Sequence, residues 1–505
     1  MERRDFLKKS VGSVLTGLLV PAPLALAKGL VQDALSKNGD PTNLPYGLLA
    51  TSQTEEIDAE LRIKGTLPPK LKGALYRNGP GIFERNGYRK RSVLDGDGMV
   101  RAYRFEDGKV KFSNRFVRTN KFVAEEKKGL FVYASWCTRA PGGALTNLLG
   151  LTLAVQGCAS VNTIRRGEKL YAFSEGVAPW EMDPHTLATL GYSTIGTKNG
   201  KSPVFNAHYK VDGKNGDWIH FGVNYGTGAV DLAVFDRDLN LLNSNELKLE
   251  WMVYMHDFFV TENYIILHYH PTMIDMISYM LGKKSFTESF SWQPERGGLL
   301  VTIDRKTLKP VGKTRIDARF MWHSVNAFED AEGKLVLDFV GFSNPDHFVG
   351  PDAATRQVMR GERGTWISPG EFCRVRYAPQ ATSATVEIVS AGGDFEFPSI
   401  RPEQVCYDYD FAFLTRKGPG ERFWNSISRV DRKTGAERRY HFPDGLYCGE
   451  PVYADGFLLT EVLNSKKERT ELHILDADRI EQGSVAVAVL PFHLPLSFHG
   501  SWDKA

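Results

Sequence analysis

The chain has 505 residues, of which 42% are hydrophobic and 24% charged, and its formal net charge is +3 at pH 7. This balance excludes an intrinsically disordered chain and gives no indication of a nucleic-acid partner. Its five cysteines, an odd and scattered set without a Cys-x-x-Cys pair, argue against a disulfide framework and against a structural zinc site. The composition fits a soluble enzyme.

Residues 1–27 have the features of a twin-arginine export signal. Residues 3–8 read Arg-Arg-Asp-Phe-Leu-Lys, a modestly apolar stretch follows at 11–26, and residues 25–27 read Ala-Leu-Ala, a small-residue cleavage site. The apolar stretch is too short, and too interrupted by Gly and Pro, for a transmembrane helix. We expect cleavage after Ala27, export by the twin-arginine translocase and a periplasmic or otherwise extracytoplasmic protein. The alternative is a cytoplasmic protein with a basic start.

Residues 28–45 are expected to form a linker, and residues 46–505 a single domain of short strands separated by turns. One pattern recurs along this domain: a strand that ends in an apolar residue, then Asp, a turn and a second strand. It occurs at Asp183, Asp236, Asp304, Asp431 and Asp476. Asp opens such a turn by accepting hydrogen bonds from amides further along the chain. A repeated antiparallel hairpin predicts an all-β fold, a β-propeller of about seven blades. Two stacked β-sandwiches are the alternative.

Two apolar segments interrupt this rhythm of strands. Residues 141–158 contain few charges, and residues 273–281 read Met-Ile-Asp-Met-Ile-Ser-Tyr-Met-Leu. Both could be ordinary core. Both could also be loops or short helices over one face of the propeller, where they would admit an apolar ligand or make peripheral contact with a membrane.

Four histidines stand in or beside apolar runs: His208, His256, His323 and His499. A buried imidazole must satisfy both ring nitrogens, and a metal ion is one way to satisfy one of them. Four imidazoles without a carboxylate ligand would indicate a transition metal. They are separated by 48, 67 and 176 residues, and a propeller can bring such distant positions together on its axis. The alternative is that twelve histidines include several that are buried by chance.

With these residues in view, the chain resembles the carotenoid cleavage oxygenases, a family that includes lignostilbene dioxygenases and the retinoid isomerase of the eye. The resemblance extends from about Pro45 to Trp502 and rests on several motifs in a characteristic order. They are Tyr76-Arg77-Asn78-Gly79-Pro80, Asp95-Gly96-Asp97-Gly98-Met99-Val100, Asn114-Arg115-Phe116-Val117-Arg118-Thr119, Met255-His256-Asp257-Phe258 and Glu396-Phe397-Pro398. The resemblance implies a seven-bladed propeller with an axial metal site: one non-haem Fe(II) per chain, held by His208, His256, His323 and His499.

The same resemblance implies three carboxylates behind these ligands. The matching positions are Glu175 in Ser174-Glu175-Gly176, Glu396 in Glu396-Phe397-Pro398 and Glu450 in Glu450-Pro451-Val452. A ligating imidazole donates its second N–H to a fixed acceptor, and a carboxylate is well suited to accept it. In the family three of the four histidines have such a partner, which here would be His256, His323 and His499. The alternative for any single glutamate is a solvated surface residue.

The resemblance finally implies a dioxygenase that uses O₂ to cleave a conjugated C=C bond of a carotenoid or apocarotenoid into two carbonyl products. Two departures bear on the substrate. Arg101 replaces a histidine common in relatives, and we expect it on a surface strand. Phe116 stands where we match the tyrosine that binds a stilbene phenol together with a lysine, and no lysine directly precedes Val161. These departures favour a polyene.

Three other readings stay open at this point. A lignostilbene-cleaving dioxygenase of the same family would use the same iron on a phenolic substrate. A non-catalytic exported propeller that acts as a binding module would carry structural histidines. An isomerase or hydrolase on the same scaffold is the third, because a fold does not determine a function.

Overall fold

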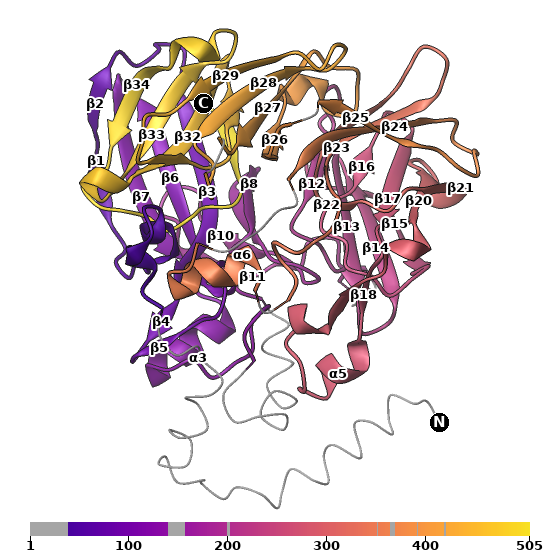
Figure 1. Ribbon diagram of the computed structural model, residues 1–505, viewed down its shortest axis with the longest axis horizontal. Coiled ribbons are helices and arrows are strands. Elements are labelled where there is room, and N and C mark those ends of the chain that lie inside the picture. Colours follow the sequence, from indigo (N-terminus) through magenta and orange to yellow (C-terminus); the bar gives the residue numbers. More distant parts are fainter. Residues whose placement is uncertain are drawn as a thin grey trace, which may run out of the picture.

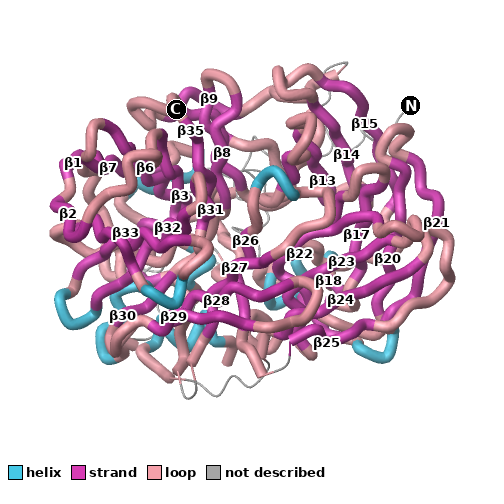
Figure 2. The backbone as a smooth tube through the Cα atoms, turned by 90° about the horizontal axis from the view of Figure 1, so that it is seen from above, coloured by secondary structure: helices cyan, strands magenta, loops and turns pink. Residues whose placement is uncertain are grey.

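The computed structural model describes residues 39–139, 157–198, 202–350, 352–363, 369–390, 392–418 and 421–505. Within these ranges the chain forms a seven-bladed β-propeller, as the repeated hairpins predicted. Figure 2 shows the blades arranged as a ring around a central axis. The alternative of two stacked β-sandwiches is therefore wrong.

The first four blades follow one another along the chain. Blade 1 contains β1 (Asp58–Glu60), β7 (Lys109–Phe116), β6 (Asp97–Glu106), β3 (Gly73–Ile82) and β35 (Gly500–Lys504). Blade 2 contains β11 (Thr189–Tyr192), β10 (Trp180–Met182), β9 (Lys169–Phe173) and β8 (Asn162–Arg166). Blade 3 contains β12 (Tyr209–Val211), β13 (Trp218–Asn224), β14 (Ala229–Phe235) and β15 (Leu241–Lys248). Blade 4 contains β16 (Phe259–Val260), β17 (Tyr264–Tyr269), β20 (Gly298–Asp304) and β21 (Lys309–Ile316).

The last three blades complete the ring. Blade 5 contains β22 (Phe320–Glu329), β23 (Leu335–Phe342), β24 (Glu371–Tyr377) and β25 (Val386–Ser390). Blade 6 contains β26 (Phe395–Ser399), β27 (Phe411–Arg416), β28 (Ser426–Asp431) and β29 (Glu437–His441). Blade 7 contains β2 (Arg62–Gly65), β34 (Ser484–Val489), β33 (Arg469–Asp476), β32 (Phe457–Asn464), β30 (Leu446–Cys448) and β31 (Val452–Ala454). Two small hairpins pair β4 (Glu84–Arg85) with β5 (Tyr88–Arg89), and β18 (Thr272–Ile274) with β19 (Phe290–Trp292).

The two ends of the domain close the ring. The C-terminal strand β35 is the innermost strand of blade 1, where it pairs antiparallel with β3. The second strand of the chain, β2, is in turn the outermost strand of blade 7, where it pairs with β34. Both ends of the chain are thus needed to complete a blade, and such closure removes free sheet edges.

The five recurring aspartates occupy equivalent places in five blades. Each is the last residue of the third strand counted from the axis, or directly follows it, and opens the turn to the fourth strand of its blade. Asp183, Asp304 and Asp431 each accept a hydrogen bond from a backbone N–H three residues further on, at 2.7, 2.7 and 2.8 Å. In the other two turns the bond comes from two residues on, to Asp236 and Asp476, at 2.9 Å in both. The repeated motif is therefore a turn of the blade hairpin.

Burial follows the position of a strand within its blade. In blade 3, β14 is buried along its whole length, while the outermost strand β15 alternates between half-buried and exposed residues. The middle strands β13 and β14 are buried on both faces because each face packs on a neighbouring blade. Phe221 of blade 3, for example, lies 4.7 Å from Phe258 of blade 4, measured between ring centroids.

Short helices lie at one side of the molecule. They are α3 (Asn120–Lys128), α5 (Met276–Met280) and α6 (Ala354–Gln357), with 3₁₀ turns η2 (Gly47–Ala50), η3 (Val93–Asp95) and η6 (Val358–Arg360). Figure 1 shows α3 and α5 at the same end of the propeller. In α5, Ile277 is 75% exposed and Met280 51%, whereas Ile274, near the start of the same apolar segment, is buried in the core, so the segment is only partly core. No helix among the described residues is long and apolar enough to span a bilayer.

Some of the expected segments lie outside the described residues. These are the export signal at 1–27, the predicted linker up to residue 38, and the apolar segment 141–158 as far as residue 156. The last part of the predicted linker is packed against the domain, because Leu44 is buried in a cluster with Leu496 and Phe498.

The expectation that Arg101 lies on the surface is wrong. Its side chain, on β6, is fully buried and pairs with Glu461 at 2.5 Å, and a second N–H donates to the carbonyl of Pro495 at 2.8 Å. Tyr103 donates its hydroxyl to the other oxygen of Glu461 at 2.7 Å. An inner propeller strand has no solvent face, so a charged residue on it needs a buried partner.

We expect Arg101→Leu to lower the free energy of unfolding by about 3–5 kcal/mol, because it leaves Glu461 as a buried charge without its partner. The control is Lys109→Ala, which removes an exposed pair with Glu60 and should cost less than about 1 kcal/mol. Urea unfolding followed by tryptophan fluorescence measures both values. An Arg101→Leu protein as stable as the control variant would contradict this account.

Candidate metal centre

The four histidines stand where innermost strands of the propeller begin. His208 directly precedes β12, His256 lies three residues before β16, His323 is on β22, and His499 directly precedes β35. All four side chains are buried, and one ring nitrogen from each lies within 4.8 Å of the others. The structure thus brings together residues from blades 1, 3, 4 and 5. The fold explains how positions so distant in sequence meet.

The four rings pack against one another, mostly edge to face, and burial favours the neutral form of His208, His256 and His499. Ring centroids of His208 and His499 lie 4.4 Å apart, and those of His323 and His499 lie 4.6 Å apart. Burial lowers the pKa of His208, His256 and His499, and the neighbouring imidazoles lower it further. A neutral imidazole has a free lone pair on one nitrogen, which is the form that binds a metal ion.

A carboxylate lies behind each of three histidines, as the resemblance implied. The Nδ1 atom of His323 is 2.5 Å from Oε2 of Glu396, and that of His499 is 2.8 Å from Oε1 of Glu450. The Nδ1 atom of His256 lies 2.6 Å from Oε1 of Glu175. Such contacts fix the ring orientation and direct Nε2 toward the centre of the cluster. Within the described chain, no carboxylate lies behind His208.

The three carboxylates differ in their electrostatic surroundings. Glu450 also accepts a hydrogen bond from the fully buried guanidinium of Arg77. Burial opposes its ionisation, but His499 and Arg77 outweigh burial and lower the pKa of Glu450. Burial raises the pKa of Glu175 well above its ordinary value, and the charge of Asp257 adds to this. A cation bound among the histidines would favour the ionised form of Glu175.

The donor set fits one divalent transition-metal ion. The Nε2 atom of His323 is buried and has no hydrogen-bond partner among the described residues. The Nε2 atoms of His208 and His256 lie 3.0 Å apart. With Nδ1–H donated to a carboxylate, as in His323 and His499, Nε2 carries only a lone pair, and such lone pairs directed at one centre repel one another unless a cation lies between them. Imidazole ligands suit zinc, copper, iron and nickel ions.

Sequence reasoning missed two residues that contact this shell. Tyr254 places its hydroxyl 2.9 Å from Nδ1 of His256, beside Glu175. Its position two residues before His256 was a signal, because alternate residues of an extended segment share a face. Arg77 stands in the motif Tyr76-Arg77-Asn78-Gly79-Pro80, which by itself does not indicate a role for its side chain. Its guanidinium also donates to Ser497 Oγ at 2.9 Å and to the carbonyl of Phe498 at 3.1 Å, which anchors the segment before His499.

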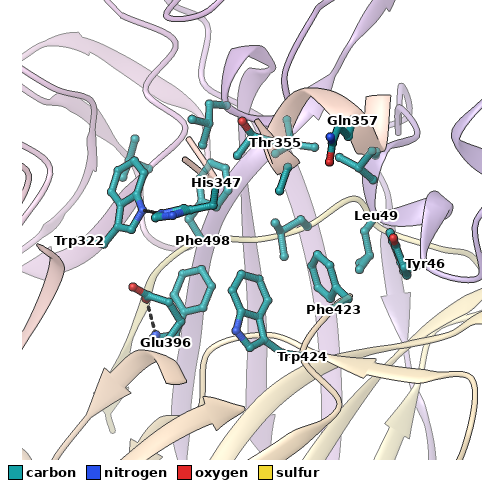
Figure 3. A pocket seen from close by; sticks show the side chains of 18 of the residues that line it. Tyr46, Leu49, Trp322, His347, Thr355, Gln357, Glu396, Phe423, Trp424 and Phe498 are labelled. Atoms are coloured by element: carbon teal, nitrogen blue, oxygen red, sulfur yellow. Dashed lines mark hydrogen bonds between the residues drawn. The ribbon is translucent and has the colours of Figure 1, made fainter. Parts of the chain in front are cut away.

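An apolar cavity leads to the histidines from the side of the short helices. His256, His323 and His499 line its inner end, and the exposed Glu362, Arg363 and Arg422 line its outer end. Between them the wall is mainly aromatic and aliphatic: Leu49, Val93, Leu94, Trp136, Val161, Trp322, Phe342, Phe397, Phe423, Trp424, Leu496 and Phe498. Figure 3 shows many of these side chains directed into the cavity. A long apolar molecule fits this lining.

The cavity has few polar groups along its described walls. Trp322 donates its Nε1–H to Nε2 of His347 at 2.5 Å, and burial lowers the pKa of His347 to about 3. Phe116, which we had matched to a phenol-binding tyrosine, is not among the lining residues and packs on Phe122 with ring centroids 5.1 Å apart. Phe116 therefore does not line this cavity and gives no argument for a polyene over a stilbene. Cys158 and Ser160 line the cavity just before Val161.

Comparison with known proteins agrees with this geometry. Residues 50–504 match the family model described as retinal pigment epithelial membrane protein. Apocarotenoid-15,15'-oxygenase of Synechocystis is 28% identical over 90% of this chain and 95% of its own length. Lignostilbene-alpha,beta-dioxygenase isozyme III of Sphingomonas paucimobilis is 27% identical over 91% and 96%.

A solved structure of cobalt-substituted Synechocystis apocarotenoid oxygenase superposes with a TM-score of 0.83. It is 27% identical, and the match covers 93% of this chain and all of that one. A metal ion can thus occupy a protein of this fold, and the buried four-histidine group is the corresponding candidate here. The chain belongs to the retinal pigment epithelial membrane protein and carotenoid cleavage oxygenase family, whose oxygenases cleave double bonds oxidatively.

Proposed function

We propose that this protein is a non-haem Fe(II) dioxygenase that cleaves a conjugated C=C bond of a carotenoid or apocarotenoid. The observation that carries the proposal is the position of the four buried histidines at the inner end of an apolar, aromatic cavity. One O₂ is consumed, and each of its oxygen atoms becomes a carbonyl oxygen of one product. The C=C bond and the bond of O₂ are replaced by two C=O bonds, so no external reductant is needed.

The side chains of the protein position and enclose the reactants. His208, His256, His323 and His499 would hold the iron, and Glu175, Glu396 and Glu450 would orient three of the four rings. The chemistry that iron supplies when bound is the activation of O₂ for addition to the double bond. The aromatic wall holds the extended polyene and keeps water away from it. No nucleophile or general base from the protein is required.

Cleavage of a stilbene is the second candidate, because the lignostilbene enzyme is almost as similar to this chain as the apocarotenoid enzyme. The lining disfavours it. Among the described residues, Tyr46 is the one tyrosine in the cavity wall and no lysine lines it. Burial raises the pKa of Tyr46, so its hydroxyl is not a base that would take a proton from a phenol.

Two further proposals concern location. Residues 1–27 would direct export of the folded protein by the twin-arginine translocase, which would place the mature protein in the periplasm. The exposed side chains of Ile277, Met280 and Leu281, on and next to α5, would make peripheral contact with a membrane. Such a contact would bring the molecule close to where apolar polyenes dissolve.

We expect His323→Ala to abolish iron retention while the circular dichroism spectrum of the propeller is unchanged. Glu396→Gln should weaken iron binding about 10- to 100-fold, because it removes the carboxylate that orients His323. His220→Ala, which removes a buried histidine outside the cluster, is the control and should keep its iron. Iron content after dialysis measures all three, and iron retained by His323→Ala would refute the ligand assignment.

We expect the iron-loaded protein, in air, to convert an apocarotenal into two carbonyl products. A hydroxystilbene should react with a kcat/KM at least about tenfold lower, because burying a phenol without a partner costs about 1–3 kcal/mol. Product analysis by mass spectrometry with ¹⁸O₂ measures both reactions, with His323→Ala as the inactive control. Faster cleavage of the stilbene would favour the second candidate, and no product from either would refute the oxygenase.

We expect the protein secreted by a host with the twin-arginine system to begin at residue 28. Replacing Arg3 and Arg4 with lysine should leave the full-length precursor in the cytoplasm, because this route reads the arginine pair. Lys9→Gln is the control and should still be exported. Intact-mass analysis of periplasmic and cytoplasmic fractions distinguishes these outcomes, and a double variant that is exported as well as the control would contradict the prediction.

A further inference from the structure

A second cavity follows the axis of the propeller. Its volume is about 450 Å³, and it is lined by residues of β8, β12, β16, β22, β26, β31 and β35, the innermost strands of all seven blades. Figure 2 shows β22, β26 and β31 near the middle of the ring. His323 and His499 line both this axial cavity and the apolar cavity, whereas His256 lines only the apolar one and His208 only the axial one among the described residues. The histidine cluster therefore separates the two cavities.

The axial cavity reaches the opposite face of the protein. Its lining begins at the buried His208 and His499, continues along the strands that follow them, and ends at the half-buried Asp503 and the exposed Pro402. The innermost strands begin near the histidines and run away from them, so the cavity that they enclose leads away from the short helices that line the apolar cavity.

The wall of the axial cavity carries charged side chains among apolar ones, and two ion pairs lie in it. Lys210 donates to Asp257 at 2.7 Å, and Arg165 donates to Asp503 at 2.9 Å. Asp257 also accepts from both the backbone N–H and the hydroxyl of Ser324, at 2.8 and 2.7 Å. A wall of this kind offers oxygen atoms to a cation without a net positive charge that would repel it. The apolar cavity, by contrast, is walled by aromatic and aliphatic side chains along most of its length.

A divalent ion and a polyene need opposite surroundings. Taking an isolated ion out of water into an apolar medium costs tens of kcal/mol, so a dication would have to keep its water shell until the histidines replace it. Six waters at about 30 Å³ each occupy about 180 Å³, which fits within the axial cavity of about 450 Å³. A polyene has no polar groups that must be stripped of water, so the hydrophobic effect favours its transfer from water into the apolar cavity.

We propose that the axial cavity is the path along which a hydrated divalent metal ion reaches and leaves the four histidines. The organic substrate enters through the apolar cavity, so the metal ion and the substrate reach the four histidines from different sides. The inference rests on the proposed function, because it takes the four histidines as the ligands of the ion. His208, His323 and His499, which line the axial cavity, are then the ligands that an arriving ion meets before His256.

The test compares two matched variants, one in each cavity. Ser399 lines the axial cavity and Thr355, seen in Figure 3, lines the apolar one; both hydroxyls lack a hydrogen-bond partner among the described residues. Replacing either with tryptophan narrows one cavity and removes no bond. Metal-free protein, prepared with a chelator, is mixed with cobalt(II) chloride in a stopped-flow spectrophotometer, and uptake is followed by the visible absorption of histidine-bound cobalt. Release is followed after addition of excess chelator.

We expect Ser399→Trp to slow both uptake and release by about tenfold or more, an increase in barrier of about 1.4 kcal/mol, while the cobalt affinity at equilibrium stays within about twofold. Thr355→Trp should load cobalt at the wild-type rate. Equal slowing of both rates at constant affinity identifies a narrowed path, because damage to the ligands would change the affinity. If Ser399→Trp does not fold, Ser501→Trp narrows the same cavity from blade 1.

Uptake by a folded Ser399→Trp or Ser501→Trp protein at the wild-type rate would overturn the proposal. Slower uptake by Thr355→Trp alone would also overturn it, because the ion would then pass through the apolar cavity. Failure of the proposed function looks different. In that case the wild-type protein itself would bind no cobalt at equilibrium, whatever the rates.

Discussion

Seven innermost strands begin close to one axis and run along it in the same direction, and this constraint places the four histidines of the candidate metal site. His208, His256, His323 and His499 need only stand near the start of such a strand to meet, whatever lies between them in sequence. The constraint in turn depends on closure of the ring. The C-terminal strand β35 closes the ring by pairing with β3. It begins with the residue after His499, so the same short segment closes the ring and positions the fourth histidine.

Two blades that contribute no histidine place a carboxylate near the start of their innermost strand instead. Glu396 is on β26 and Glu450 lies two residues before β31, in blades that contribute no histidine, so each reaches sideways to the histidine of another blade. Glu175 does the same from the hairpin of blade 2. Arg77 compensates the charge of Glu450, whereas Glu175 has no comparable buried cation among the described residues. A dication among the rings would supply it, which couples ionisation of Glu175 to metal binding.

The sequence was sufficient for features that depend on local chemistry. The aspartate turns predicted the hairpins and hence the propeller, and the apolar runs around the histidines predicted their burial. It was insufficient wherever a side chain could face either of two neighbours. Arg101 could be placed on a strand but not given its partner Glu461, because the two come from different blades and 360 residues separate them. The sequence also could not show whether Phe116 faces the cavity, since strand alternation does not say which of two buried faces meets it.

The Glu396-Phe397-Pro398 motif shows how one short segment can serve both the metal site and the apolar cavity. Phe397 has a φ of +48°, in the left-handed region that an aromatic residue rarely adopts. The pairing of β26 with β27 is irregular at this point. The strain is offset locally, because the backbone N–H of Phe397 donates to the Glu396 carboxylate at 2.6 Å and its ring stacks on His323 at 5.4 Å between centroids. An ordinary β conformation would turn adjacent side chains to opposite faces. The strained one lets Glu396 reach His323 while the next residue walls the cavity, so the backbone strain follows from the demand that adjacent residues face the same site.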